Sequence, residues 1–289
     1  KSDDAADPVI DKMPVMPRPP EAALSPAPLP EVGPALRERM TPNLVSEVTP
    51  EPVTAEPERN EFGLSCVVVL TASERDAGLV KLTLTAPCRG EQRISVMHEG
   101  MVYSAQTTQL GTYAGLVPVL VADAEFTVVF PDGERATTEL SLPIADQIER
   151  VALQFTGNAG LQIHALEFGA DYGEAGHVWF DKPGDAAMAA RTGGGVMTLL
   201  GDTTLKAADV VQVYPYPMQT SRDGTVHVSV EAEVTAFNCA TDVSGQTIQR
   251  QGDGSIRPVS VTVAMPDCDA IGEYLVLKNL LRDLKIASN

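Results

Sequence analysis

The side chains that could do chemistry gather in the stretch 164–181, whose sequence is HALEFGADYGEAGHVWFD. It contains two imidazoles, His164 and His177, and four carboxylates, and such groups bind zinc and calcium in proteins. Their spacing matches no metal-binding pattern, and the H-E-x-x-H signature of zinc hydrolases does not occur. A metal site that serves a metal-dependent hydrolase is therefore the weakest alternative that this stretch leaves open.

The same stretch is also a glycine-rich loop that carries aromatic side chains. Glycines let a ligand approach the backbone closely, and rigid aromatic rings supply binding area at a small entropic cost. We therefore predict that the loop 169–179 is a recognition surface. Its expected binding residues are Tyr172, His177, Trp179 and Phe180. The structural alternative is that Trp179, the single tryptophan of the chain, fills the core of its domain.

Two further acidic positions raise the question of calcium. Asp253 lies in a Gly-Asp-Gly-Ser run, and Asp267 lies close to Asp269. The calcium-loop pattern D-x-[DN]-x-[DN]-G is absent, and Gly-Asp-Gly is typical of a hairpin turn. Calcium binding stays a lesser alternative, and we predict no cofactor.

The sequence motifs of catalytic sites are missing as well. Ser244 lacks the flanking glycine of a G-x-S-x-G motif, and the glycine run at 191–195 lacks the G-K-[ST] ending of a phosphate-binding loop. His98 shares its strand face with apolar residues and is expected to be packed, whereas His227 faces away from its neighbouring valines and is expected in solvent. We therefore nominate no catalytic residue. A non-catalytic role is favoured, while enzymatic activity stays open.

The net charge restricts the partners. The 289 residues include 21 Lys and Arg against 39 Asp and Glu, which gives a net charge of −18. A chain this acidic repels phosphate backbones, which argues against a nucleic-acid partner. No run reaches the roughly 18 consecutive apolar residues of a membrane span. Because the first residue is Lys1, an upstream signal peptide, membrane anchor or cloning boundary stays open.

Four cysteines indicate the compartment. They form two well-separated pairs, and the second cysteine of each pair follows an alternating strand pattern and a proline. With no C-x-x-C motif, we predict the disulfides Cys66–Cys88 and Cys239–Cys268 and an oxidising compartment. We therefore expect a periplasmic or extracellular protein. The alternative is four buried free thiols in a cytosolic protein.

The composition divides the chain into three parts. Residues 1–60 contain 13 of the 22 prolines and no aromatic residue. Such a segment cannot bury enough apolar surface to offset its ordering entropy, so we predict a disordered or extended acidic tether. Alternating strand patterns predict a β-sandwich over 61–143 and a second β-rich domain over 144–289.

The expected fold class is mainly β, with two small antiparallel sandwich-like domains that each hold one disulfide. One helix is expected at the C-terminal end. Leucines at 277, 280, 281 and 284 follow the i, i+3, i+4, i+7 spacing of one helix face. This spacing predicts a short helix over about 274–285, packed on the second sandwich.

Several motifs carry a resemblance to known families. The region 93–133 has a strand pair around Gly100, a Gly111-x-Tyr113 turn, a Val-Pro-Val run at 117–119 and an Asp132-Gly133 hairpin. In these features it resembles the transthyretin-like sandwich that serves as a regulatory domain in carboxypeptidases and many exported proteins. That resemblance implies an antiparallel sandwich fold.

The whole chain also resembles an exported family of marine and photosynthetic alphaproteobacteria. The matching runs are LEFGADYG at 166–173, GHVW at 176–179 and AMPDCDA at 264–270. Members of that family are sometimes labelled "translocase", but the chain has no motif of a translocation ATPase or a channel. The family brings no known catalytic residue.

The function predicted from these features is non-catalytic. We expect an exported envelope protein that acts as an interaction or accessory subunit of a larger assembly. A membrane tether through its N-terminal segment stays open. Its partner would be a protein of the cell envelope, which a proline-rich arm could wrap by folding on binding. The alternative is a glycan- or peptidoglycan-binding module that uses the Trp179 loop.

Overall fold

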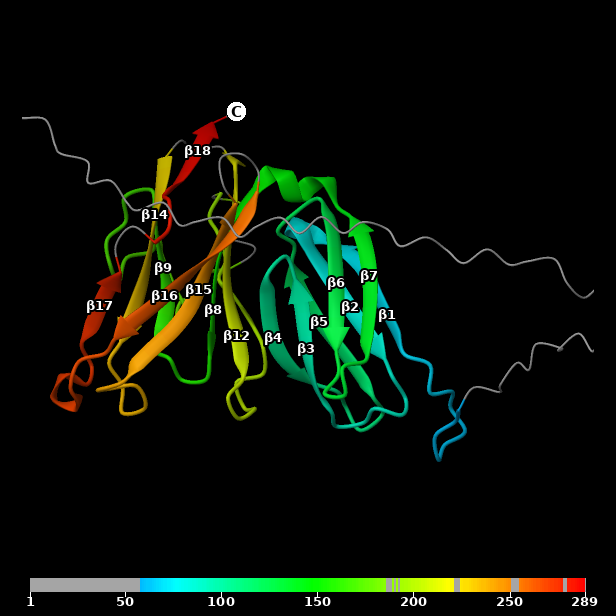
Figure 1. Cartoon of the computed structure of the whole chain (residues 1–289). Coiled ribbons are helices and arrows are strands. Elements are labelled where there is room, and N and C mark those ends of the chain that lie inside the picture. The colour runs from blue at the N-terminus through cyan, green and yellow to red at the C-terminus, as the bar shows by residue number, and fades with distance from the viewer. Residues whose placement is uncertain are drawn as a thin grey trace, which may run out of the picture. The chain divides into compact units, whose positions relative to one another are not determined.

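The computed structural model describes residues 58–185, 189, 191, 193–220, 224–250, 255–277 and 280–288. In this part of the chain, strands build four sheets (Figure 1). The strands before residue 143 are β1 (Val69–Arg75), β2 (Leu79–Thr85), β3 (Arg93–His98), β4 (Met101–Gln106), β5 (Thr112–Pro118), β6 (Asp123–Val129) and β7 (Arg135–Ser141). The predicted tether at 1–60 lies almost wholly outside the described residues.

The strands after residue 143 are β8 (Ile148–Thr156), β9 (Leu161–Glu167), β10 (His177–Val178), β11 (Thr198–Leu200), β12 (Asp209–Pro217), β13 (Gln219–Thr220), β14 (Gly224–Glu233), β15 (Asp242–Arg250), β16 (Ile256–Ala264), β17 (Tyr274–Leu277) and β18 (Leu284–Ser288). Three short 3₁₀ turns lie between strands: η1 (Asp76–Gly78), η2 (Pro143–Gln147) and η3 (Cys268–Ala270). The prediction of a mainly β, antiparallel fold is confirmed.

The first seven strands form two sheets, with the orders β1-β2-β5 and β4-β3-β6-β7. Their alternating apolar residues face inward, as the strand periodicity requires. Val80, Leu82 and Leu84 of β2 are fully buried, and so are Phe126 and Val128 of β6. Both sheets therefore contribute one face to a common core, which is a β-sandwich arrangement.

The later strands form a five-stranded sheet, β11-β12-β8-β15-β16, and a second sheet with the order β10-β9-β14-β18-β13. In the second sheet, β14 pairs with β9 along one edge and with β17 and β18 along the other. Val151 and Leu153 of β8 pack with Ile163 of β9 and Val230 of β14 in a second core. These two sheets thus pack face to face.

The five-stranded sheet is buried on both faces. On β8, Val151 and Leu153 point into the second core, whereas Ala152 between them belongs to the same core cluster as the first seven strands. Val211 and Val213 of β12 join Ala152 on that side. The alternation of side chains across one strand therefore lets a single sheet serve two cores.

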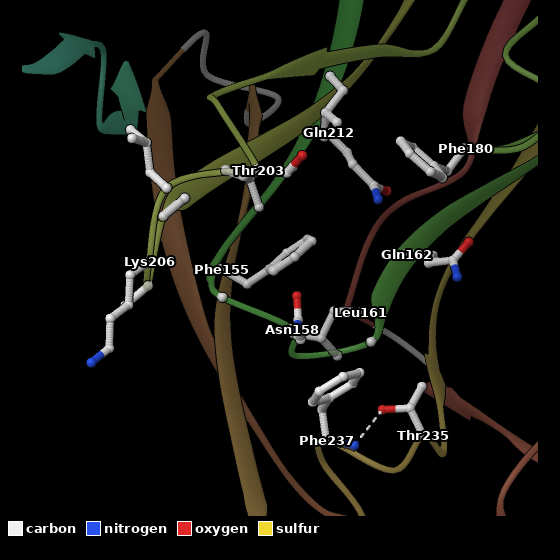
Figure 2. Close-up of a pocket in the computed structure, with 17 residues that line it drawn as sticks. Phe155, Asn158, Leu161, Gln162, Phe180, Thr203, Lys206, Gln212, Thr235 and Phe237 are labelled. Carbon is white, nitrogen blue, oxygen red and sulfur yellow. Dashed lines mark hydrogen bonds between the residues drawn. The ribbon is translucent and has the colours of Figure 1, made fainter. Parts of the chain in front are cut away.

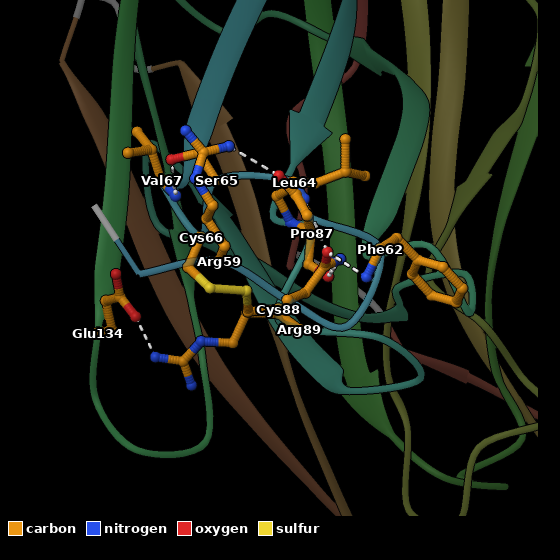
Figure 3. The surroundings of a disulfide bond; sticks show 12 residues. Arg59, Phe62, Leu64, Ser65, Cys66, Val67, Pro87, Cys88, Arg89 and Glu134 are labelled. Carbon is orange, nitrogen blue, oxygen red and sulfur yellow. Dashed lines mark hydrogen bonds and ion pairs between the residues drawn. A yellow bond between two sulfur atoms is a disulfide. The ribbon is translucent and has the colours of Figure 1, made fainter. Parts of the chain in front are cut away.

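Both predicted disulfides are present. Cys66 joins Cys88 with 5.1 Å between the Cα atoms, and Cys239 joins Cys268 with 5.0 Å. Figure 3 shows the first bridge, which holds the segment before β1 against the loop after β2. Two such bridges fit a protein that works outside the reducing cytoplasm. Within the described residues, no helix has the length and apolar character that a membrane crossing needs.

The predicted C-terminal helix is wrong. Tyr274–Leu277 and Leu284–Ser288 are strands, and both pair with β14. Without them, the edge of β14 opposite β9 would keep unpaired backbone groups, and strand pairing satisfies these groups. This tertiary requirement overrides the helical spacing of the leucines, which reach the core from two short strands and the segment between them.

One turn also differs from expectation. An Asp-Gly pair between two strands, as at Asp132-Gly133, predicts a type I′ turn, which requires a positive φ at both residues. Only Gly133 has one, at 88°, and its N–H donates to the carbonyl oxygen of Phe130. The connection is instead a longer loop with a single left-handed glycine. The Asp223-Gly224 pair predicts a hairpin turn of the same type, but Asp223 lies outside the described residues.

Candidate functional site

The predicted recognition loop begins where β9 ends and lies against one face of the sheet that contains β9 and β14. Ile163 and Ala165 of β9 are in the core, so His164 between them points to the opposite face. The register places His164 opposite Ser229 of β14, and Gln162 opposite Glu231. Two strands therefore bring an imidazole and a carboxylate together outside the core.

His164 and His177 form a buried hydrogen-bonded pair. His164 Nδ1 and His177 Nε2 are 2.8 Å apart, and the two residues are only 3% and 4% exposed. The backbone N–H of Gly173 donates to His177 Nδ1 at 3.0 Å. His177 must then carry its proton on Nε2 and donate it to His164 Nδ1. The remaining proton of His164 is on Nε2, which lies 3.6 Å from a carboxylate oxygen of Glu231.

Glu231 joins this pair to the surface. Its Oε1 accepts hydrogen bonds from the hydroxyl groups of Tyr172 and Ser229. Burial, reinforced by the hydrogen bond to Glu231, raises the pKa of Tyr172 above its ordinary value. Burial also lowers the pKa of both His164 and His177. One run of hydrogen bonds thus leads from Gly173 through His177 to His164, and Glu231 separately accepts bonds from Tyr172 and Ser229. His164 Nε2 faces Glu231 without a hydrogen bond.

Trp179 covers the histidine pair. Its ring stacks on His164 with 5.1 Å between centroids, and on His177 with 5.7 Å. Tyr172 meets His177 edge-on at 5.0 Å. Of the four predicted binding residues, His177 and Trp179 therefore lie within a packed ring stack. Tyr172 and Phe180 present 53% and 44% of their surface to solvent.

Phe180 contributes to a separate pocket of about 640 Å³ beside this stack (Figure 2). Two more phenylalanines line it: Phe155 at the end of β8, and Phe237, which is 79% exposed on the loop after β14. Figure 2 shows the three rings coming from three separate segments of the chain. The sequence predicted only Phe180, although an aromatic residue in the polar run Thr-Ala-Phe-Asn at 235–238 was a usable signal for Phe237.

The polar side chains of the pocket come from β9, β12 and the connecting loops. They are Asn158, Gln162, Thr203, Lys206, Gln212 and Thr235. Gln212 is buried, and its Oε1 accepts the backbone N–H of Ile163 at 2.8 Å. This bond bridges the two sheets of the second sandwich and leaves the amide nitrogen of Gln212 for the pocket.

The loops that wall the pocket are held by side-chain hydrogen bonds. Asn238 donates to the carbonyl oxygens of Ala159 and Glu233, at 2.9 Å and 2.8 Å, and so ties the loop of Phe237 to the β8–β9 turn. On the other wall, Arg93 of β3 donates to the carbonyl oxygens of Lys206 and Ala207. The pocket walls thus depend on both sandwiches.

The chemistry of this pocket suits recognition. Among the described residues that line it, Lys206 is the only one with an ionisable side chain. Aromatic and aliphatic walls with a few amide and hydroxyl groups are typical of ligand sites in which polar groups fix orientation.

The other histidines behave as predicted. His98 is buried, and its Nε2 accepts the N–H of Leu120 while its Nδ1 donates to the carbonyl oxygen of Glu125. Burial lowers its pKa to about 4, so it is a neutral packing residue. His227 is exposed and lies 2.8 Å from a carboxylate oxygen of Asp283.

The metal and calcium alternatives concern the stretch 164–181 and the acidic positions Asp253, Asp267 and Asp269. Among the described residues, His, Cys, Asp and Glu side chains form no group of three that could hold a metal ion. Asp267 and Asp269 lie at η3, beside the second disulfide, and Asp253 is outside the described residues.

Comparison with known proteins does not assign the chain to a family. Neither the scan against models of protein families nor the search of curated proteins gives a match for the chain.

Proposed function

We propose that this chain is a non-catalytic binding protein that recognises a carbohydrate chain at the pocket of Phe155, Phe180 and Phe237, which we call the aromatic pocket. The observation that carries the proposal is the composition of that pocket. Three phenylalanine rings alternate there with amide and hydroxyl side chains, and Lys206 is the only ionisable side chain among its described residues. General acid–base catalysis most often uses a histidine or a carboxylate, and the described lining contains neither.

A sugar chain matches these features better than a purely apolar ligand. A pyranose ring has an apolar face that packs against an aromatic ring, and hydroxyl groups around its edge that form hydrogen bonds. Phe180 and Phe237 supply exposed ring surface, and Gln212 and Asn158 supply amide groups. Exposed aromatic surface close to oriented polar groups is a common design of ligand sites.

The cellular setting that we propose is the envelope, with the protein periplasmic or extracellular. The two disulfides support an oxidising compartment. The proline-rich composition of residues 1–60 suits a spacer that would keep the binding head away from an anchoring surface. Glycan strands of the cell wall are then the polymer within reach of the aromatic pocket.

The proposal is tested by calorimetric titration of the purified chain with a soluble chitin oligosaccharide and with solubilised cell-wall glycan. Phe180→Ala and Phe237→Ala should each weaken binding about tenfold, because each removes one stacking ring, worth roughly 1–1.5 kcal/mol. Phe62→Ala is the matched control, since Phe62 is also strongly exposed but lies outside the aromatic pocket. Binding that is absent, or that is equally strong in all three variants, contradicts the proposal.

A second candidate function is that of an accessory subunit that docks on an envelope protein. Large apolar side chains are exposed along the segment before and into β1: Phe62, Leu64, Val67 and Val69. Figure 3 shows the first three beside the Cys66–Cys88 disulfide, which fixes this segment. Exposed apolar groups of this kind often mark protein contacts. Purification from the native host separates the candidates, because a stoichiometric protein partner supports the subunit and retention on cell-wall glycan supports the binding module.

A further inference from the structure

The turn that carries Phe180 is fixed by the histidine pair, although the pair does not line the aromatic pocket. Trp179 and Lys182 exchange backbone hydrogen bonds of 3.2 Å and 3.1 Å, which close a tight turn around Phe180 and Asp181. Trp179 stacks on both His164 and His177. The position of Phe180 therefore depends on the residue immediately before it, and that residue rests on two imidazole rings.

A second contact ties the same turn to the recognition loop. The Lys182 ammonium group donates to the carbonyl oxygen of Glu174 at 2.6 Å. The loop is in turn held by the Gly173 N–H bond to His177 and by the Tyr172 bond to Glu231. Loop, turn and histidine pair are thus one connected unit on the face of β9 and β14.

The histidine pair cannot take up an additional proton without losing a hydrogen bond. Of the four ring nitrogens, His177 Nδ1 and His164 Nδ1 already accept hydrogen bonds, and the other two carry hydrogens. A proton added to His164 Nδ1 would oppose the N–H of His177 across 2.8 Å. A proton added to His177 Nδ1 would oppose the N–H of Gly173 across 3.0 Å. Protonation of either ring therefore breaks one of the bonds that hold the loop.

Some of the charged groups around the pair raise the pKa values of the two histidines, and others lower them. Glu231 on β14 and Asp181 in the turn favour a protonated His164, whereas Lys182 disfavours a protonated His177. Tyr172 faces the pair as a neutral phenol. Burial is the largest effect and lowers the pKa of both histidines below the ordinary 6.5. Their contribution to loop stability is thus complete above about pH 6.5 and is lost as the pH falls through the lower pKa of the folded protein.

We propose that the His164–His177 pair is a proton-operated latch that holds Phe180 at the aromatic pocket at neutral pH and releases it in mild acid. The inference rests on the proposed glycan binding, because it assigns a regulation to that site. Once the pair is protonated, Trp179 loses the neutral stack beneath it, and the turn with Phe180 is no longer fixed. Glycan affinity then falls with pH, although the described lining of the aromatic pocket contains no histidine and no carboxylate.

Two readouts on the full chain test the latch between about pH 7.5 and 5.2, where His98, with a pKa of about 4, stays neutral. The first is titration with the soluble chitin oligosaccharide at each pH. The second is the fluorescence of Trp179, which is the single tryptophan of the chain and whose emission imidazolium groups quench. We expect glycan affinity to fall about fivefold across this range, and the Trp179 emission to change with the same midpoint.

Two variants assign the effect to the pair. When His164→Gln and His177→Asn are combined, both readouts should become independent of pH, because both buried protonation sites are gone. Each single variant removes one of the two sites and should weaken the pH dependence, which keeps the test open if the double variant does not fold. The amide oxygen introduced by His177→Asn can still accept the N–H of Gly173. His227→Gln is the matched control, since His227 is exposed on β14 and pairs with Asp283. Both readouts of this variant should depend on pH as in the wild type.

The outcomes separate the latch from the binding proposal. Glycan binding at neutral pH that does not change in mild acid overturns the latch and leaves the binding function standing. A pH-dependent loss that persists in the folded double variant, or that is undiminished in both folded single variants, also overturns it. If the glycan binds at no pH, the binding proposal fails, and the Trp179 titration alone decides on the latch. A midpoint that disappears in the variants then supports the latch, and a signal without a midpoint contradicts it.

Discussion

The guanidinium group of Arg93 donates a hydrogen bond of 2.8 Å to the carbonyl oxygen of Ala207, 114 residues further along the chain. A second bond, of 2.7 Å, runs from the same group to the carbonyl oxygen of Lys206. Ala207 has a φ of 48°, which is uncommon for alanine, so its conformation needs support from outside the loop. A residue of the first sandwich thereby holds one wall of the aromatic pocket in the second.

Removing this support should weaken the wall without unfolding the protein. In Arg93→Ala we expect faster amide hydrogen exchange over residues 201–208 and weaker glycan binding, at a cost to global stability of about 1 kcal/mol for exposed bonds. Arg135→Ala, which removes another exposed arginine of the first sandwich, is the control and should leave the exchange of this loop unchanged. Equal exchange in the two variants would show that Arg93 does not position the wall.

His98 should make the first sandwich sensitive to acid. Its pKa is lowered to about 4 by burial, while the unfolded chain titrates near 6.5. The folded state excludes a proton that the unfolded state binds, so stability is complete above about pH 6.5 and falls as the pH decreases toward 4. Urea unfolding at about pH 7 and pH 5 should show a His98-dependent loss of roughly 2 kcal/mol. His98→Gln should reduce this pH dependence, and an unchanged dependence would contradict the assignment.

Each disulfide should stabilise its sandwich by restricting the unfolded chain. The bridges close loops of 22 and 29 residues, for which loop-closure entropy gives about 3 kcal/mol each. Replacing Cys66 and Cys88 together by alanine, or Cys239 and Cys268 together, should lower the free energy of unfolding by that amount in urea titrations. Mass spectrometry of protein purified from its native host under thiol blocking is the independent check. Four freely alkylatable cysteines would exclude both bridges in the cell.

Strand periodicity and cysteine spacing carried most of what could be predicted. The alternating positions of Val80, Leu82 and Leu84 predict which face of β2 is buried, because side chains of a strand alternate between its two faces. The cysteine pairs likewise lie next to strands whose ends must meet. In contrast, the leucines near the C-terminus have helical spacing, and only the unpaired edge of β14 explains why they belong to strands. No local pattern carries that information.

The candidate site was predictable only in part for the same reason. Phe180 stood out as an aromatic residue next to a glycine-rich loop, but the sequence does not show that it turns away from Trp179 toward Phe155 and Phe237. These rings come from segments far apart in the chain, and the loops that place them are fixed by tertiary bonds such as those of Asn238. The hydrogen bond between His164 and His177 similarly depends on the pairing of β9 with β10.

The central claim is that a glycan binds at the aromatic pocket, and chemical-shift mapping tests it most directly. Amide resonances of the isotope-labelled chain are recorded while the soluble chitin oligosaccharide is added at neutral pH. The account predicts that the largest shift changes fall on three loops of the aromatic pocket, 157–162, 203–208 and 235–237, together with Phe180. Shift changes centred on the exposed segment 62–69, or no changes at saturating oligosaccharide, would contradict it.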